Sequence, residues 1–285
     1  MPVAVPTRRA LDAIEAAARA RGLPVDEMRI VRDATNVLVH LEPAPIVARV
    51  PITLARLRPK AWFEQEVRLA RLLARGGAPV APPSEEVDPG PAEYDGLLVT
   101  FWQHIDHDPA RFEPEPVGRS LRELHAAMSE YEEPLPVFDR IDEVCRLLDS
   151  LHPSRLVSEY DLAALRLAAE QLDEPPAGEW RPIHGDSHFN NVLWSSEGPL
   201  WTDLENACRG PVEYDLACLL WRGAPETDRA VAAYGAYDAE LAARLEPFLA
   251  VFLASWTIAV VERNPSPGAE AELGRRIERA SVRPG

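Results

Sequence analysis

The sequence of 285 residues predicts an α+β fold, with a small strand-rich first lobe and a larger, mostly helical second lobe. Early in the chain, three short runs rich in β-branched residues are separated by turn-forming residues, which predicts an antiparallel meander. The apolar spacing then changes to that of helices and stays so for nearly all of the remainder. We place the boundary after Trp102, which gives lobes of residues 1–102 and 103–285.

The first lobe begins with an alanine-rich helix at 7–21, which we expect Thr7 to cap and Gly22 to end. Strands, a helix and a last apolar strand should follow at 29–32, 37–41, 46–50, 59–75 and 97–102.

The second lobe should be helical apart from one hairpin, whose strands at 192–194 and 200–202 flank the turn residues 195–198. We expect no other sheet there. Proline-bearing breaks separate predicted helices at 117–131, 138–151, 156–172, 211–221, 228–245, 248–261 and 269–280.

Composition narrows the classes of protein. Forty-six acidic and 30 basic residues give a formal net charge of −16, which argues against a nucleic-acid-binding surface. Three cysteines without metal-type spacing favour a reducing compartment, so we expect a cytoplasmic protein. The N-terminus lacks the pattern of a secretory signal. The most apolar run, 248–261, is too short to span a bilayer, so we interpret it as a buried helix and expect no membrane partner.

The densest group of polar residues surrounds the predicted hairpin. Because a hairpin brings its two ends together, Asn191 and Asp203 should be cross-strand neighbours with side chains roughly 5 Å apart. Two oxygen ligands at that spacing suit a hard cation. Asp186 lies in the loop that leads into the hairpin, where it could act on a molecule held beside the cation.

This stretch resembles the catalytic core of the aminoglycoside phosphotransferase and choline kinase-like family, whose members share a two-lobed fold with protein kinases. The residues that carry the resemblance are His184-Gly185-Asp186 with Asn191, then Asp203-Leu204-Glu205, then Gly210-Pro211 with Asp215. The resemblance implies ATP- or GTP-dependent transfer of the γ-phosphate to a hydroxyl of a small molecule, such as an aminoglycoside-like antibiotic, an amino alcohol or a sugar.

The resemblance also implies a role for each residue of the motif. Asp186 would be the catalytic base, and Asn191 and Asp203 would ligate Mg²⁺ ions that bridge the nucleotide phosphates. His184 would hold the loop rather than transfer protons, and Asp215 would tie a helix to that loop.

The first lobe matches the family less closely. Arg49 stands where the family has a lysine on the third strand, and Glu66 matches the glutamate that pairs with that lysine. Arginine can hold a carboxylate or phosphate with two parallel donors, although an ordinary solvent-facing strand residue is the alternative. Thr35 and Asn36 match polar positions of the family's phosphate-covering turn, which here has no glycine.

By family position, Phe101 and Trp102 would meet the purine. The acceptor would lie between the catalytic loop and the last helices, where Glu205, His188, Trp221 and Glu262 are candidate contacts. Acids would suit an amino sugar and aromatic faces a quaternary ammonium, so a cationic acceptor is among the expected partners. Trp256 could also contribute, but on an apolar helix we favour a core position for it.

Three other interpretations fit parts of the sequence. The segment 185–188 resembles the first signature of metal-dependent phosphoesterases, but their later histidine-bearing segments do not follow. His104 to Asp108 could bind a metal, although a solvated linker fits its polar context better. Arg49 and the glycine-free turn also allow a nucleotide-binding pseudokinase that acts as a scaffold without turnover.

Overall fold

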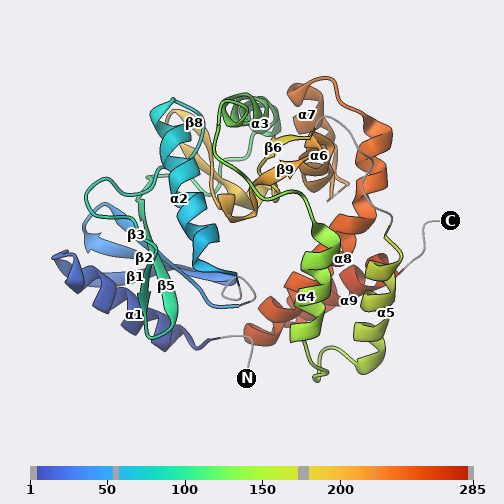
Figure 1. The fold of residues 1–285 in the computed structure, drawn as a ribbon, viewed down its shortest axis with the longest axis horizontal. Helices are drawn as coiled ribbons and strands as arrows, with labels where there is room; N and C mark the ends of the chain where they lie inside the picture. Colours follow the sequence, from blue (N-terminus) through green and yellow to red (C-terminus); the bar gives the residue numbers. More distant parts are fainter. Residues whose placement is uncertain (1–4, 54–57, 173–179, 222, 282–285) are drawn as a thin grey trace.

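The computed structural model describes residues 5–53, 58–172, 180–221 and 223–281. A five-stranded antiparallel sheet, in the order β1-β2-β3-β5-β4, forms the first lobe (Figure 1). Its strands and the two helices beside it are α1 (Thr7–Ala20), β1 (Val25–Asp33), β2 (Asn36–Pro43), β3 (Ile46–Pro51), α2 (Lys60–Arg75), β4 (Ala92–Tyr94) and β5 (Leu97–Gln103).

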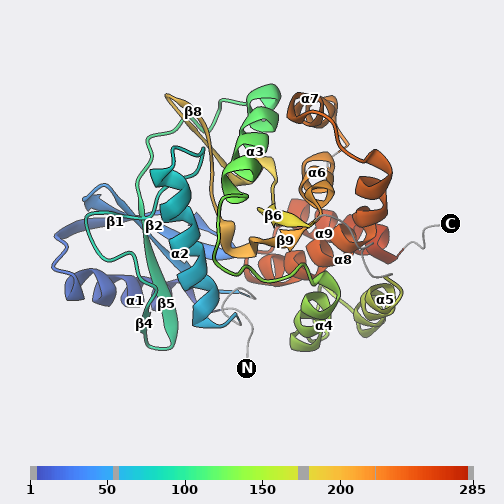
Figure 2. The ribbon, with the colours of Figure 1, turned by 45° about the horizontal axis from the view of Figure 1, so that its top comes forward.

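Alternation along the central strands builds the core of this lobe. Val37, Val39 and Leu41 of β2 point to one face and are fully buried with the matching residues of β3 and β5. The alanine-rich face of α1 covers this core from outside, whereas α2 lies between the sheet and the second lobe (Figures 1 and 2). The helix period therefore directs α2, and Glu66 on it, towards the junction of the lobes.

The second lobe is mostly helical, so the predicted fold class is confirmed. Its elements are α3 (Pro114–Met128), α4 (Arg140–Ser150), α5 (Glu159–Glu170), β6 (Arg181–Ile183), η2 (Phe189–Asn191), β7 (Val192–Ser195), β8 (Gly198–Trp201), η3 (Leu204–Asn206), β9 (Cys208–Gly210), α6 (Val212–Leu220), α7 (Pro225–Tyr234), α8 (Ala239–Arg263) and α9 (Pro267–Ser281).

Two predictions for this lobe are wrong. β6 and β9 form an additional antiparallel pair that brackets the loop and hairpin, although no second sheet was expected. The chain also breaks at Gly235, whose φ is 118°, instead of between residues 245 and 248. Pro247 lies inside α8 because the helix is buried along most of its length, and this packing outweighs the backbone bond that proline removes.

By length and apolar composition α8 passes the test for a membrane-spanning helix, but 61% of its most apolar window is buried inside the protein. It packs against α4, α6 and α9, as a core helix does. The interpretation of residues 248–261 as a buried helix is therefore confirmed.

An arginine at the end of α8 joins the two lobes. Arg263 Nη2 donates to Asp33 Oδ1 at 2.6 Å, and its guanidinium also bonds the Thr7 hydroxyl and the Val5 carbonyl oxygen. Thr7 does not cap α1 through its side chain; its hydroxyl donates to Asp33 Oδ2 at 2.7 Å. Because Asp33 ends β1, this Arg263–Asp33 bridge fixes the turn between β1 and β2 against α8.

The bridge should contribute measurably to stability. Arg263 is only 8% exposed, so we expect Arg263→Gln and Asp33→Asn each to lower the free energy of unfolding by about 2 kcal/mol. In a urea-unfolding double-mutant cycle, the two changes should show a coupling energy of about 1 kcal/mol or more. The exposed Arg19–Glu15 pair is the control, for which a coupling below about 0.5 kcal/mol is expected. Equal coupling in both cycles would contradict a special role for the bridge.

Candidate active site

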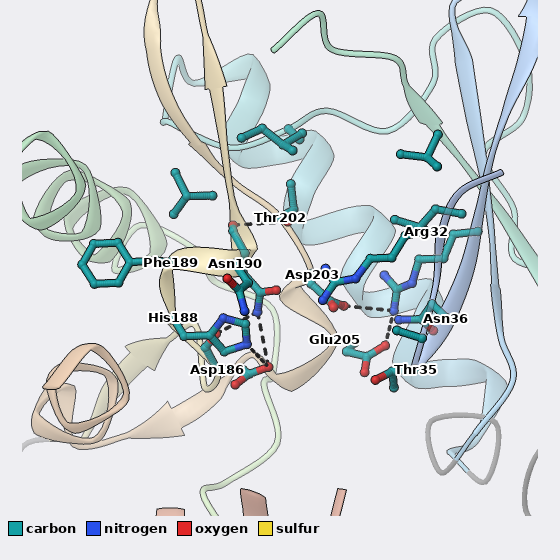
Figure 3. Close-up of a pocket in the computed structure, with 18 of the residues that line it drawn as sticks. Arg32, Thr35, Asn36, Asp186, His188, Phe189, Asn190, Thr202, Asp203 and Glu205 are labelled. Atoms are coloured by element: carbon teal, nitrogen blue, oxygen red, sulfur yellow. Dashed lines mark hydrogen bonds and ion pairs between the residues drawn. The ribbon is translucent and has the colours of Figure 1, made fainter. Parts of the chain in front are cut away.

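A cleft of about 900 Å³ lies between the lobes and collects most of the residues singled out from the sequence. Its first-lobe wall includes Thr35 and Asn36 of the β1–β2 turn, and Asp186, His188 and Asn191 line it from the second lobe. Figure 3 shows Asp186 and His188 on one side of this cleft, with Asp203 and Glu205 between them and the turn. The fold therefore brings together residues that are separated by more than half of the chain.

A buried acid holds the loop that carries Asp186. Asp215, near the start of α6, accepts hydrogen bonds at 2.8 Å from the backbone N–H groups of His184 and Gly185. His125 Nε2 lies 2.7 Å from the same carboxylate. Although burial opposes it, these bonds lower the pKa of Asp215, so the group stays ionised. This contact is the helix-to-loop tie that the sequence resemblance implied.

His184 braces the other end of the loop. Its Nδ1 accepts from the N–H of Asp186 at 3.2 Å, so the second nitrogen, Nε2, carries the proton and donates to the Thr202 carbonyl oxygen at 2.9 Å. Burial lowers the pKa of His184 below its ordinary value of 6.5, so the ring is neutral. A neutral ring with both nitrogens engaged fits a structural role and links the Asp186 loop to the residue before Asp203.

Because His184 is buried and neutral, lowering the pH should destabilise the folded protein. Above pH 6.5 His184 is neutral in both folded and unfolded chains, whereas below it only the unfolded chain takes up the proton. The free energy of unfolding should therefore fall as the pH is lowered from 6.5 to 5. His184→Gln should remove that part of the pH dependence in urea unfolding, while His152→Gln, at an exposed position, should not. Identical pH profiles for native protein and His184→Gln would contradict the assignment.

Asp186 is half-buried and its neighbours fix its position. Asn191 Nδ2 donates to the Asp186 carbonyl oxygen at 2.9 Å and lies 3.3 Å from Asp186 Oδ2. His188 Nε2 lies 3.5 Å from the same carboxylate oxygen. With its amide nitrogen turned to Asp186, Asn191 has only its side-chain oxygen with which to bind a cation.

The hairpin has the predicted turn but a pairing one residue different from the expectation. Val192 pairs with Trp201, and the Thr202 N–H donates to the Asn191 carbonyl oxygen at 2.9 Å. Asn191 is therefore opposite Thr202, and Asp203 follows in a left-handed conformation with φ 68° and ψ 52°. That conformation, uncommon outside glycine, ends β8 and begins η3.

The donors at this point suit a hard divalent cation. Asn191 offers an amide oxygen and Asp203 a carboxylate, which are the ligand types that Mg²⁺ takes in proteins. Asp203 Oδ1 is buried and accepts no hydrogen bond, although it lies 3.2 Å from Arg49 Nη2. Among the described residues no group of three or more His, Cys, Asp or Glu could hold a metal ion, so a bound ion would need phosphate or water oxygens as further ligands.

Arg49 is buried at the centre of three carboxylates. Its Nη1 donates to Glu66 Oε1 at 2.6 Å, and its Nη2 contacts both Glu205 and Asp203. The side chain is 5% exposed, so it is not a solvent-facing strand residue. Burial raises the pKa of Glu66 even though Arg49 acts to lower it. Burial also acts to lower the pKa of Arg49, but the surrounding carboxylates outweigh it and raise that pKa. The pairing of Arg49 with the α2 glutamate therefore exists, and it extends to the Asp203 loop.

Comparison with known proteins places the chain in a family. The model of the phosphotransferase enzyme family matches residues 28–248, which include Arg49, Asp186, Asn191 and Asp203. The chain belongs to the phosphotransferase enzyme family.

Individual matches of this phosphotransferase-family chain are shorter or more distant. It is 38% identical over 64 residues to stress response kinase A of Escherichia coli K12, which is 20% of this chain and 19% of that protein. The chain thus matches about a fifth of the length of this curated relative.

Solved structures show the same fold over nearly the whole length. The amicoumacin kinase hAmiN, in complex with AMP-PNP, Ca²⁺ and Ami, has a TM-score of 0.69 at 13% identity, covering 95% of this chain and 92% of that one. The choline kinase LicA of Streptococcus pneumoniae has a TM-score of 0.66 at 14% identity, covering 95% and 98%. At these identities the likeness establishes a kinase-like fold.

The predicted nucleotide contacts of this family member divide into two groups. Thr35, Asn36 and Trp102 line the cleft, and Asn36 Oδ1 is a buried oxygen that accepts no hydrogen bond within the described structure. Phe101, in contrast, is fully buried in the core of the first lobe and does not line the cleft. The strand alternation explains this, because neighbouring residues of β5 point to opposite faces.

Two of the four predicted acceptor contacts do not line the cleft. Trp221 follows α6 outside the cleft, where the Arg279 guanidinium covers its ring at 3.7 Å, and Glu262 is exposed on α8 away from the cleft. Glu205 lines the cleft, but Arg49 and Arg58 bind its two carboxylate oxygens. His188 lines the cleft beside Asp186, and its contact with the acceptor stays a prediction.

Arg58 is a site residue that the sequence interpretation missed. Its guanidinium binds Glu205 and Glu143, and it lies over the rings of Trp62 and Trp256 at 4.8 and 5.2 Å. The partners come from α2, α4, η3 and α8, so no local sequence pattern could have indicated the contact. Its sequence neighbours carry no motif that marks it.

Proposed function

We propose that this phosphotransferase-family protein transfers the γ-phosphate of ATP or GTP to a hydroxyl of a small molecule in the cytoplasm. The observation that carries the proposal is the convergence of Asp186, Asn191 and Asp203 on one cleft, between a turn of the first lobe and the helical lobe. The nucleotide-binding lobe would end at Trp102 and the acceptor lobe begin at Gln103. Aminoglycoside-like antibiotics, amino alcohols and sugars are the acceptor classes to test first.

In this mechanism Asp186 receives the proton of the acceptor hydroxyl as its oxygen forms a bond to the γ-phosphorus and the bond to the leaving nucleoside diphosphate breaks. Asn191 holds Asp186 in place through the amide hydrogen bond to its carbonyl oxygen. Asp203 and the Asn191 side-chain oxygen would hold Mg²⁺, which offsets negative charge on the phosphates when bound. Positioning and charge account for most of the rate enhancement in such reactions.

Arg49 would orient the nucleotide phosphates together with the β1–β2 turn. Its buried bond to Glu66 fixes the guanidinium, and arginine keeps its charge in such a site. Without glycine, the turn presents Thr35 and Asn36 as polar contacts in place of closely approaching backbone amides. The Arg263–Asp33 bridge supports that turn from outside the cleft.

One observation favours a second candidate function. Arg49 Nη2 lies 3.2 Å from Asp203 Oδ1, so part of the charge that would attract a cation is already matched by the protein. A nucleotide-binding scaffold without turnover would tolerate that contact. An enzyme requires that a nucleotide with its metal ion compete with Arg49 for Asp203.

Two assays separate these functions. The first follows Mg²⁺-dependent nucleotide consumption with a panel of aminoglycosides, amino alcohols, sugars and hydroxy acids, and the second measures thermal stabilisation by nucleotide. Phosphorylation of any acceptor supports the enzyme and excludes the scaffold. Stabilisation by nucleotide without turnover of any panel member would support the scaffold. A cleft that binds no nucleotide would contradict both.

A further inference from the structure

The groups in the cleft that could recognise a cationic acceptor are already bound to the protein's own arginines. Within the described residues, four carboxylates line the cleft: Asp186, Asp203, Glu205 and Glu272. Asp186 is assigned to the reaction itself. Each of the other three lies within ion-pair distance of at least one arginine.

Glu205 and Glu272 are each bound by two arginines, whereas Asp203 lies near one. Arg49 and Arg58 bind separate oxygens of Glu205, which is 4% exposed. Glu272 accepts from Arg276 Nε at 2.8 Å and from Arg275 Nη2 at 2.7 Å. Although burial opposes it, these bonds lower the pKa of Glu272. An ammonium group of an acceptor would have to displace an intramolecular arginine, so these acids offer it little affinity.

The ring of Trp256, which could bind a quaternary ammonium, is also covered by an arginine of the protein. Trp256 of α8 lines the cleft, but the Arg58 guanidinium lies 5.2 Å from the centroid of its ring. Phe252, one turn earlier, packs on Trp256 with ring centroids 5.8 Å apart. With Val260 these rings give α8 an apolar wall towards the cleft. That wall suits the apolar face of an acceptor better than a cationic group.

Beside this wall, Arg276 has a guanidinium whose position is fixed by bonds within the protein. Arg276 of α9 lines the cleft and is 27% exposed. Its Nη1 donates to the Thr257 hydroxyl at 2.7 Å and its Nε donates to Glu272, and neither bond uses Nη2. Because Glu272 is shared between Arg275 and Arg276, the cluster of these three residues has one excess positive charge. A guanidinium fixed in this way is a suitable partner for a carboxylate or phosphate.

We infer that the acceptor is an anionic hydroxyl compound, a hydroxy acid or sugar acid without ammonium groups, whose acidic group binds Arg276 while its apolar face lies on Phe252 and Trp256. The inference rests on the proposed phosphotransfer and names its substrate class. It also narrows the acceptor panel, because polyamino sugars and choline-like compounds become poor substrates.

Three matched primary alcohols test this charge preference: 3-(hydroxymethyl)benzoate, 3-methylbenzyl alcohol and 3-(hydroxymethyl)benzylamine, which carry a negative, zero and positive charge. With nucleotide and Mg²⁺, kcat/KM should be at least about tenfold higher for the benzoate than for the benzylamine, since one charged contact is worth roughly this much. Ligand-observed NMR on the nucleotide-loaded protein measures the same order for binding, whether or not a probe is phosphorylated.

A charge reversal assigns the preference to Arg276. Arg276→Glu should remove or invert the ratio of benzoate to benzylamine, in kcat/KM or in binding. Arg279→Glu, at another exposed arginine of α9 that lies outside the cleft and pairs with Glu246 instead of Glu272, is the matched control and should keep most of the ratio. Equal or better use of the benzylamine by native protein, or a ratio unchanged in Arg276→Glu, would overturn the inference. Failure to phosphorylate any hydroxyl compound, with the binding order retained, would instead count against the proposed function alone.

Discussion

Asp186→Asn is expected to lower kcat by about 10²- to 10⁴-fold while nucleotide binding stays within about twofold, because the amide cannot take up the proton of the acceptor hydroxyl. The change is nearly isosteric, and the backbone bond from Asn191 to the Asp186 carbonyl oxygen does not depend on the side-chain charge. Initial rates at saturating nucleotide measure kcat, and nucleotide titration in a thermal-shift assay measures binding.

A matched control for this variant is Asp106→Asn, an exposed aspartate on the loop after β5, which should leave kcat unchanged. Product formation at the native rate in Asp186→Asn would remove the base assignment. A parallel loss of nucleotide binding would instead mean that Asp186 acts on the cleft as a whole. A lower kcat with unchanged nucleotide affinity therefore assigns Asp186 to the proton transfer, whereas a loss of both assigns it to the structure of the cleft.

Arg49→Gln should produce the largest loss of stability among the site variants. It would leave the buried Glu66 without the guanidinium that binds it and Glu205 with Arg58 alone, and removal of one partner of a buried ion pair typically costs about 3–5 kcal/mol. Because burial already raises the pKa of both carboxylates, they should take up protons in the variant, so its stability should fall as pH rises through their raised pKa values. Urea unfolding at several pH values measures this.

Arg49→Lys provides a second variant that keeps the charge. A single ammonium cannot hold Glu66 with one nitrogen and Glu205 with another, so we expect a smaller loss of stability and a weaker affinity for nucleotide. Arg29→Gln is the control, because Arg29 also lines the cleft but pairs with Glu42 at 51% exposure and should cost less than about 1 kcal/mol. An Arg49→Gln protein as stable as this control would contradict the claim that Arg49 stabilises the buried carboxylates around it.

Local patterns were sufficient for much of the fold. Alternation identified the strands around Val39 and Ala48, and helical spacing identified α2, whereas Glu66 was singled out by the family resemblance. Turn residues also predicted the hairpin that carries Asn191 and Asp203. These elements are determined by residues close together in sequence, and each has a period or a turn signal of its own.

Features that depend on distant residues were not predictable in this way. β6 and β9 have three residues each, too few to show a period, and they pair across more than 20 residues of sequence. The partners Arg263 and Asp33 are 230 positions apart. The bonds of Arg58 and Arg276 likewise decide which acids remain available in the cleft, and only the folded chain reveals them. For this reason the sequence could not show that Trp221 and Glu262, which were predicted to contact the acceptor, lie outside the cleft.

The most direct test of the central claim follows the transferred atom itself. Protein, Mg²⁺ and nucleotide labelled in the γ-phosphate are incubated with 3-(hydroxymethyl)benzoate and, separately, with the acceptor panel, and the label is located by mass spectrometry. We predict that label appears as a phosphate ester on an acceptor hydroxyl, that EDTA abolishes this product, and that Asp186→Asn reduces it at least about 100-fold. Nucleotide bound in the cleft with no label on any acceptor, or an ester formed equally by Asp186→Asn, would contradict the account.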